Sequence, residues 1–175
     1  SLCGSGGARH GRRARADQCL TVAQGERPNT EDEVELADIR ERFLQAPLAQ
    51  RLVVSLSGTA TTMCVPEAGD GEDIFDRPDQ RALGFQLSQL RAVVMNRDLA
   101  QGRDVFVTAH ELRHSWQAVH VPALSSSRLA PPHDATAVFI KEADANAFAV
   151  ATAWQLREQG EPDSWQVARQ SLSYG

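Results

Sequence analysis

The chain has 175 residues, of which 42% are hydrophobic and 23% are charged, and its formal net charge is −5. This length and composition predict one globular domain that can bury a core without help from disulfides or a structural metal. The negative net charge argues against nucleic acid as the main partner, and the sequence lacks the run of about eighteen apolar residues that a membrane span requires. The oligomeric state is not predicted. The compartment is left open, with the cytoplasm slightly favoured, because a chain that begins with Ser1 is compatible with a removed leader.

The three cysteines, Cys3, Cys19 and Cys64, form an odd set without CxxC spacing. Such a set matches neither a zinc knuckle nor a disulfide framework. We therefore expect small buried or free thiols, with a Cys3–Cys19 bridge as the alternative if the protein is exported.

The N-terminal residues 1–29 are predicted to be a mobile tail rich in Gly and Arg, and residues 30–175 are predicted to form the domain. The apolar turn 19–23 is a candidate for a short element within the tail. Thr30 and Glu33 have the spacing of a capping box, which predicts a helix that begins after Thr30 and runs to about residue 45. A second helix is expected to begin at Pro47 and to end near residue 56.

Three short segments rich in apolar or β-branched residues favour strands, at 61–65, 82–86 and 91–96. We expect an α+β fold that is mainly helical, with a small antiparallel sheet preceding a buried helix over 104–119. The 91–96 strand lies just before that helix, so we also expect its edge to accept an extended peptide as one more strand. Beyond it, a long helix capped by Asp134 is predicted to run to about Gln159, and a last helix follows Pro162.

The helix over 104–119 carries the pattern HExxH, with His110 and His114 four residues apart. Residues at this spacing share one helix face, so both imidazoles can reach one ion at about 2.0–2.1 Å, the usual Zn–N distance. Glu111 lies about 100° further round the helix, where a carboxylate suits the role of general base better than that of a ligand. The alternative is a solvated helix that carries two histidines by chance.

The predicted long helix places Glu142, Ala145, Asn146 and Ala149 on one face. Small alanines allow close approach to another helix, and a carboxylate buried in that contact would require a partner such as a metal. We therefore predict Glu142 as the third ligand of a Zn²⁺ ion and Asn146 as an acceptor for an imidazole N–H. The alternatives are a surface Glu142, or Asp144 as a weaker ligand candidate.

His120 is a rival third ligand, because HExxHxxQxxH places it at the spacing of the third metzincin histidine. The metzincin pattern has Gly where this chain has Gln117, since the helix must turn there with positive φ. The metzincin Met-turn also lies downstream of the motif, whereas Met63 and Met95 precede it. These departures favour Glu142 over His120.

HExxH followed by an ExxAN stretch 28 residues later resembles the gluzincin branch of the zincin metallopeptidases. The likeness covers roughly residues 83–156 and is strongest to minimal ImmA/IrrE-like and related metallopeptidase domains. It implies a zincin-like fold, zinc held by His110, His114 and Glu142, Glu111 as base, and Asn146 orienting an imidazole. Many gluzincins have Asp where this chain has Asn146; Asn can still accept an N–H, but without the charge.

The resemblance implies hydrolysis of a protein or peptide substrate by a metal-activated water, with Glu111 moving the proton. His120, His133 and Tyr174 are candidates to stabilise the oxyanion, and the sequence does not choose among them. Two other classes of function stay open. One is a zincin-fold protein that binds a partner or processes one target without general proteolysis, and the other is a metal-free helical interaction domain.

Overall fold

The computed structural model describes residues 19–24, 27–66, 84–87, 91–96, 99–125 and 131–172. The chain order of its elements is β1 (Cys19–Thr21), α1 (Glu31–Phe43), α2 (Pro47–Leu56), β2 (Thr62–Cys64), β3 (Gly84–Leu87), β4 (Ala92–Met95), α4 (Arg103–His120), the 3-10 helix η2 (Pro122–Ser125), α5 (Pro131–Glu158) and α6 (Asp163–Leu172). The predicted tail before residue 19, together with Cys3 and Tyr174, lies outside the described residues.

The four strands form one sheet in the order β1-β2-β4-β3. The β1–β2 and β3–β4 pairs are antiparallel, whereas β2 and β4 run parallel, so the sheet is mixed and the prediction of an antiparallel sheet is wrong for this pair. Because β4 has a partner on both sides, the predicted addition of a peptide at its edge is also wrong. The α+β class, mainly helical with a small sheet before the motif helix, is confirmed.

The strand β1 belongs to the sheet, although the sequence analysis placed its residues in the N-terminal tail. Leu20 and Val22 explain why, since both are buried against the core. Burying these apolar side chains removes them from water, which favours a folded position for this segment over a free one. The folded part of the chain therefore extends N-terminal to the predicted boundary at residue 30.

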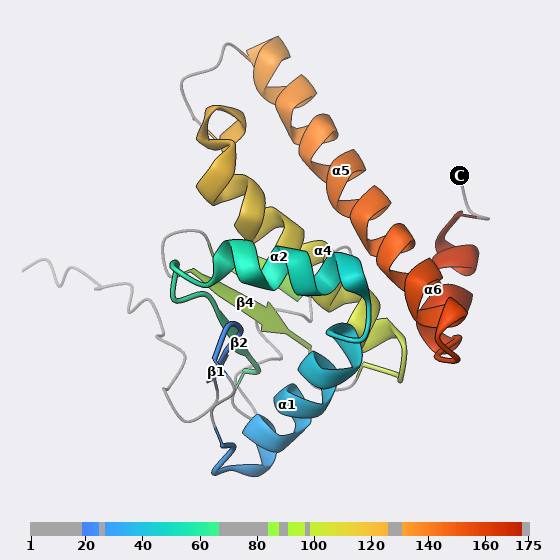
Figure 1. Cartoon of the computed structure of the whole chain (residues 1–175). Coiled ribbons are helices and arrows are strands. Elements are labelled where there is room, and N and C mark those ends of the chain that lie inside the picture. The colour runs from blue at the N-terminus through green and yellow to red at the C-terminus, as the bar shows by residue number, and fades with distance from the viewer. Residues whose placement is uncertain are drawn as a thin grey trace, which may run out of the picture.

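The two N-terminal helices begin where their local signals predict. Thr30 accepts a hydrogen bond from the backbone N–H of Glu33, and the Glu33 carboxylate accepts one from the Thr30 N–H, which together form the capping box. Pro47 occupies the first turn of α2, where its missing N–H costs nothing. Figure 1 shows α2 crossing over α4 and β4, with α1 lower in the same view.

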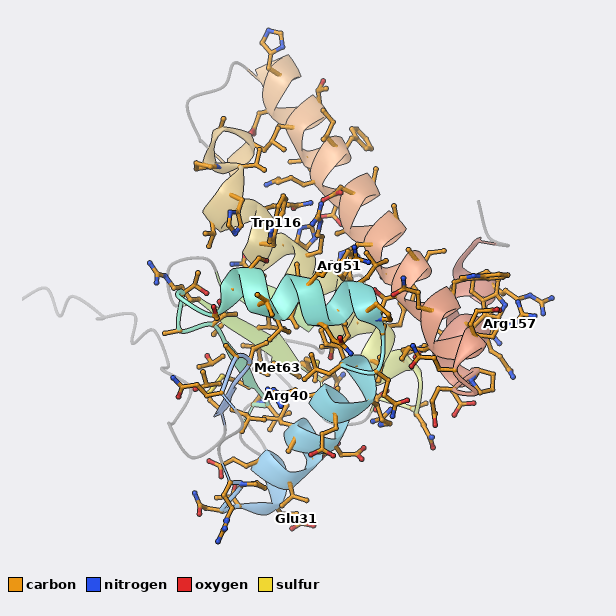
Figure 2. The ribbon with its side chains drawn as sticks, viewed as in Figure 1. Glu31, Arg40, Arg51, Met63, Trp116 and Arg157 are labelled. Carbon is orange, nitrogen blue, oxygen red and sulfur yellow. A yellow bond between two sulfur atoms is a disulfide. The ribbon has the colours of Figure 1, made fainter. Side chains whose placement is uncertain are left out.

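The core lies between the sheet and the helices α1, α2, α4 and α5. Figure 2 labels Met63 of β2, which is fully buried there, and Glu31, which begins α1 at its exposed end. Gly102 is the N-cap of the motif helix α4, and its φ of +83° lies in the left-handed region. A Cβ on Gly102 would lie 2.6 Å from the backbone carbon of Asp163, so only glycine lets the start of α4 pack this closely on the start of α6.

The helix α5 runs alongside α4 and continues to α6, which packs against it (Figure 1). Its buried positions next to α4 are small, since Ala145 and Ala149 are both fully buried. Asp134 was predicted to cap this helix. The helix begins at Pro131, so Asp134 lies in its first turn and the prediction is wrong. None of the described helices is long and apolar enough to cross a membrane.

Cys19 and Cys64 form a disulfide between β1 and β2, where they occupy directly opposite positions. The prediction of free thiols is therefore wrong for this pair, and Cys19 is not available for the alternative bridge to Cys3. The sequence could not reveal the bridge, because the register that brings residues 45 apart together is a property of the sheet.

Candidate metal centre

His110 and His114 project from the same face of α4, as their spacing predicts. Their ring centroids are 4.7 Å apart with the rings nearly perpendicular, and their Nε2 atoms are 3.0 Å apart. The two side chains are 18% and 15% exposed. Both imidazoles are therefore largely shielded from water.

Glu142 of α5 supplies a third donor group to this cluster. One carboxylate oxygen lies 3.3 Å from His110 Nε2, and the other lies 3.3 Å from His114 Nε2. The prediction of Glu142 as a ligand rested partly on a buried carboxylate. The Glu142 side chain is 49% exposed, so that part of the reasoning is wrong. Its convergence with the two imidazoles is the stronger reason to consider it a ligand.

The donor set fits a divalent cation of the zinc type. The three donor atoms all lie within 4.8 Å of one another, and two imidazoles with one carboxylate are a common set of zinc ligands. Two ligands bonded to a tetrahedral zinc at about 2.0–2.1 Å lie about 3.3 Å from each other. The observed spacings of 3.0 and 3.3 Å between donor atoms are close to that value.

Glu111, the residue after His110, is buried beside the cluster with 8% exposure. Burial raises the pKa of its carboxyl from 4.5 to about 7, and the negative charge of Glu142 adds to the increase. The strand β3 contributes to this burial, because a Cβ on Gly84 would lie 3.3 Å from Glu111 Cγ. A carboxyl with a pKa near neutrality is suited to accept and return a proton.

Burial lowers the pKa of His110, and the charge of His114 lowers it further, while Glu142 and a hydrogen bond with Asn146 act in the opposite direction. The neutral imidazole that burial favours is the form that binds a metal. The contact between Asn146 and His110 places the predicted orienting residue next to one of the two imidazoles.

His120 and His133, the two predicted oxyanion stabilisers among the described residues, do not join the cluster. α4 continues as a helix to His120, which stacks on Trp116 with 4.9 Å between ring centroids. His120 thus lies about 9 Å along the helix axis from His114, and the metzincin arrangement does not form. His133 is exposed in the first turn of α5, and it lies about 13 Å from Glu142 along the axis of α5.

Two residues next to the cluster, Gln117 and Arg113, were missed as functional candidates, and Asp144 was considered only as a weaker ligand. Gln117 Oε1 lies 2.9 Å from His114 Nδ1, and Gln117 Nε2 donates to the carboxylate of Asp144, which Arg113 also binds. The hydrogen bonds from Arg113 are the main reason that the pKa of Asp144 is lowered. The sequence held one signal that could have identified Gln117. It follows His114 by three residues and therefore shares its helix face.

Comparison with known proteins identifies a family for the chain through a family model alone. No curated protein and no solved structure matches the chain significantly. The model of a family described as "Putative metallopeptidase family (DUF6782)" matches residues 13–174, which include the complete donor cluster. Because this match spans nearly the whole chain, the protein belongs to that family.

Proposed function

We propose that this protein is a zinc-dependent peptidase of gluzincin type, in which His110, His114 and Glu142 hold the ion. The observation that carries the proposal is the convergence of three donor atoms within 4.8 Å, from two helices, beside a buried carboxyl group. Membership of a metallopeptidase family supports the same reaction class. The exposed Glu142 leaves the cluster accessible to a protein or peptide substrate.

Zinc at these residues would lower the pKa of a water molecule and polarise the substrate carbonyl. Glu111 then takes the proton from the attacking water and passes it to the leaving amine. In the metal-free protein, burial and the charge of Glu142 raise the pKa of the Glu111 carboxyl to about 7. A carboxyl buried beside the three donors is placed to accept a proton and to return it. Asn146 raises the pKa of His110, and in this proposal its amide oxygen would accept an N–H of that imidazole and orient the ring.

The test is to measure zinc content and cleavage of a denatured protein substrate for the wild type and for Glu111→Gln and Glu142→Ala. We expect one zinc per wild-type chain, zinc retained without turnover in Glu111→Gln, and weakened zinc binding in Glu142→Ala. His120→Ala is the matched control for a histidine lost from α4 outside the cluster, and its zinc content should equal that of the wild type.

Three results would contradict this proposal. Full activity in Glu111→Gln would remove the assigned base. Wild-type protein that binds zinc but cleaves neither denatured nor native proteins would favour the alternative, a protein that binds a partner or processes one specific target. Wild-type protein purified without chelator that contains no metal, and takes up none, would exclude both.

A further inference from the structure

Gln117 is buried between α4 and α5 with 2% exposure, and both polar atoms of its amide have partners. Its Nε2 lies 2.9 Å from the backbone oxygen of Lys141 and 2.8 Å from a carboxylate oxygen of Asp144. Both of these partners accept hydrogen bonds only, so the nitrogen must face them. The amide oxygen consequently faces His114.

This orientation determines which nitrogen of His114 carries the hydrogen. Gln117 Oε1 is an acceptor and lies 2.9 Å from His114 Nδ1, so Nδ1 must donate. The other nitrogen, Nε2, is then unprotonated in the neutral ring, and it is the atom that faces Glu142 at 3.3 Å. An unprotonated Nε2 is the atom that a metal ion binds.

We propose that Gln117 is a positioning residue that holds His114 in the Nδ1–H tautomer with Nε2 directed at the metal. This inference rests on the proposed metal site and adds a residue to it that the sequence analysis did not assign. Gln117 also binds the backbone of Lys141, the residue immediately before Glu142. The buried amide of Gln117 therefore contacts one proposed ligand on α4, His114, and the backbone next to the proposed ligand on α5.

Asp144 and Arg113 hold the amide of Gln117 in this orientation. Arg113 donates from Nε and Nη2 to the two oxygens of Asp144, at 2.7 and 3.0 Å. The guanidinium also lies 3.9 Å from the ring centroid of Trp116, which is labelled on α4 in Figure 2. The result is a continuous series of contacts, from Arg113 through Asp144 and Gln117 to His114, that passes from α4 to α5 and back and restrains the imidazole.

The first experiment compares Gln117→Met with Gln155→Met. Gln155 is the matched control, because its amide also joins two helices, by accepting from the backbone N–H of Leu48, but outside the donor cluster. The zinc dissociation constant is measured by competition with a chromophoric chelator, and the unfolding free energy of the metal-free proteins is measured alongside. We expect zinc binding about 10–100-fold weaker in Gln117→Met and unchanged in Gln155→Met.

Zinc affinity in Gln117→Met equal to that of the wild type would overturn the inference. An equal loss of affinity in both variants, in proportion to their loss of stability, would overturn it as well, because it would indicate a purely structural role. Failure of the wild type to bind zinc would instead refute the proposed function.

A second experiment needs neither a variant of Gln117 nor bound metal. Nitrogen NMR of the metal-free wild type, labelled at histidine, reports which ring nitrogen is protonated at a pH where the imidazoles are neutral, and His114→Ala assigns the signal. We expect hydrogen on Nδ1 of His114. Hydrogen on Nε2 would overturn the inference even if Gln117→Met could not be folded.

Discussion

Replacing the buried base by its neutral analogue is expected to stabilise the metal-free protein in a pH-dependent manner. The pKa of Glu111 is raised from 4.5 to about 7 by burial and by the charge of Glu142. Below pH 4.5 the carboxyl is neutral in both the folded and the unfolded protein, so Glu111→Gln should change the unfolding free energy little. Between these two pKa values only the unfolded chain loses its proton, so the wild type loses stability as the pH rises.

The size of the effect follows from the difference between those two pKa values, 4.5 and about 7. At about 1.4 kcal/mol per unit, the wild type above pH 7 should be less stable than Glu111→Gln by about 3 kcal/mol. Glutamine keeps nearly the same shape and volume, so the difference reports mainly the charge. Above pH 7 the folded carboxyl is ionised as well, and the difference should level off.

Urea unfolding of both proteins with a chelator present, across the range from below pH 4.5 to above pH 7, measures this difference. Glu158→Gln is the control, because it changes an exposed carboxyl near the end of α5 and should shift stability by no more than about 0.5 kcal/mol. A stability difference between wild type and Glu111→Gln that did not grow with pH would refute the assignment of a raised pKa. A wild type more stable than the variant above pH 7 would refute it as well.

Three further outcomes are expected from the structure. Cys19→Ala combined with Cys64→Ala should lower the unfolding free energy by about 4 kcal/mol in urea, because the bridge closes a loop of 45 residues; a loss under 1 kcal/mol would indicate that the bridge does not form. Glu142→Ala should weaken zinc binding while the circular dichroism of the metal-free protein is retained, and unchanged zinc affinity would remove Glu142 from the ligand set. Gly84→Ala should cost about 1–3 kcal/mol in the same unfolding assay, because its Cβ would lie 2.8 Å from Val107 Cγ1 and would push β3 away from α4; a variant as stable as the wild type would show that β3 does not pack this closely.

The parts of the site that could be predicted are those that follow from spacing within one helix. His110 and His114 had to share a face if residues 104–119 were helical, and α4 extends from Arg103 to His120. The capping box at Thr30 and the proline at the start of α2 are signals of the same local kind, and both helices begin as predicted. Glu142 was reached through a motif and a resemblance, and its burial was overestimated.

What could not be predicted depends on how separate elements meet. The parallel β2–β4 pairing and the Cys19–Cys64 bridge both depend on strand order, and the spacing of residues along the chain does not determine strand order. Gln117 could be placed on the same helix face as His114, but its two partners on α5 are known only once the rotation of α5 against α4 is known. From the sequence alone, Gln117 served only as evidence against a helix turn.

The residues of the cluster are suited to hydrolysis but do not stabilise the metal-free fold, and their electrostatics explain why. The negative charge of Glu142 raises the pKa of Glu111 and so opposes ionisation of that buried carboxyl, and burial disfavours protonation of His110. A divalent cation at the three donors would favour the ionised carboxylates and the neutral imidazoles at the same time. A ligand that binds only the folded chain stabilises it, so the cost of assembling these groups is offset where the metal binds. The Gln117 contacts fit this arrangement, since a ring held before metal binding loses less freedom when the metal binds.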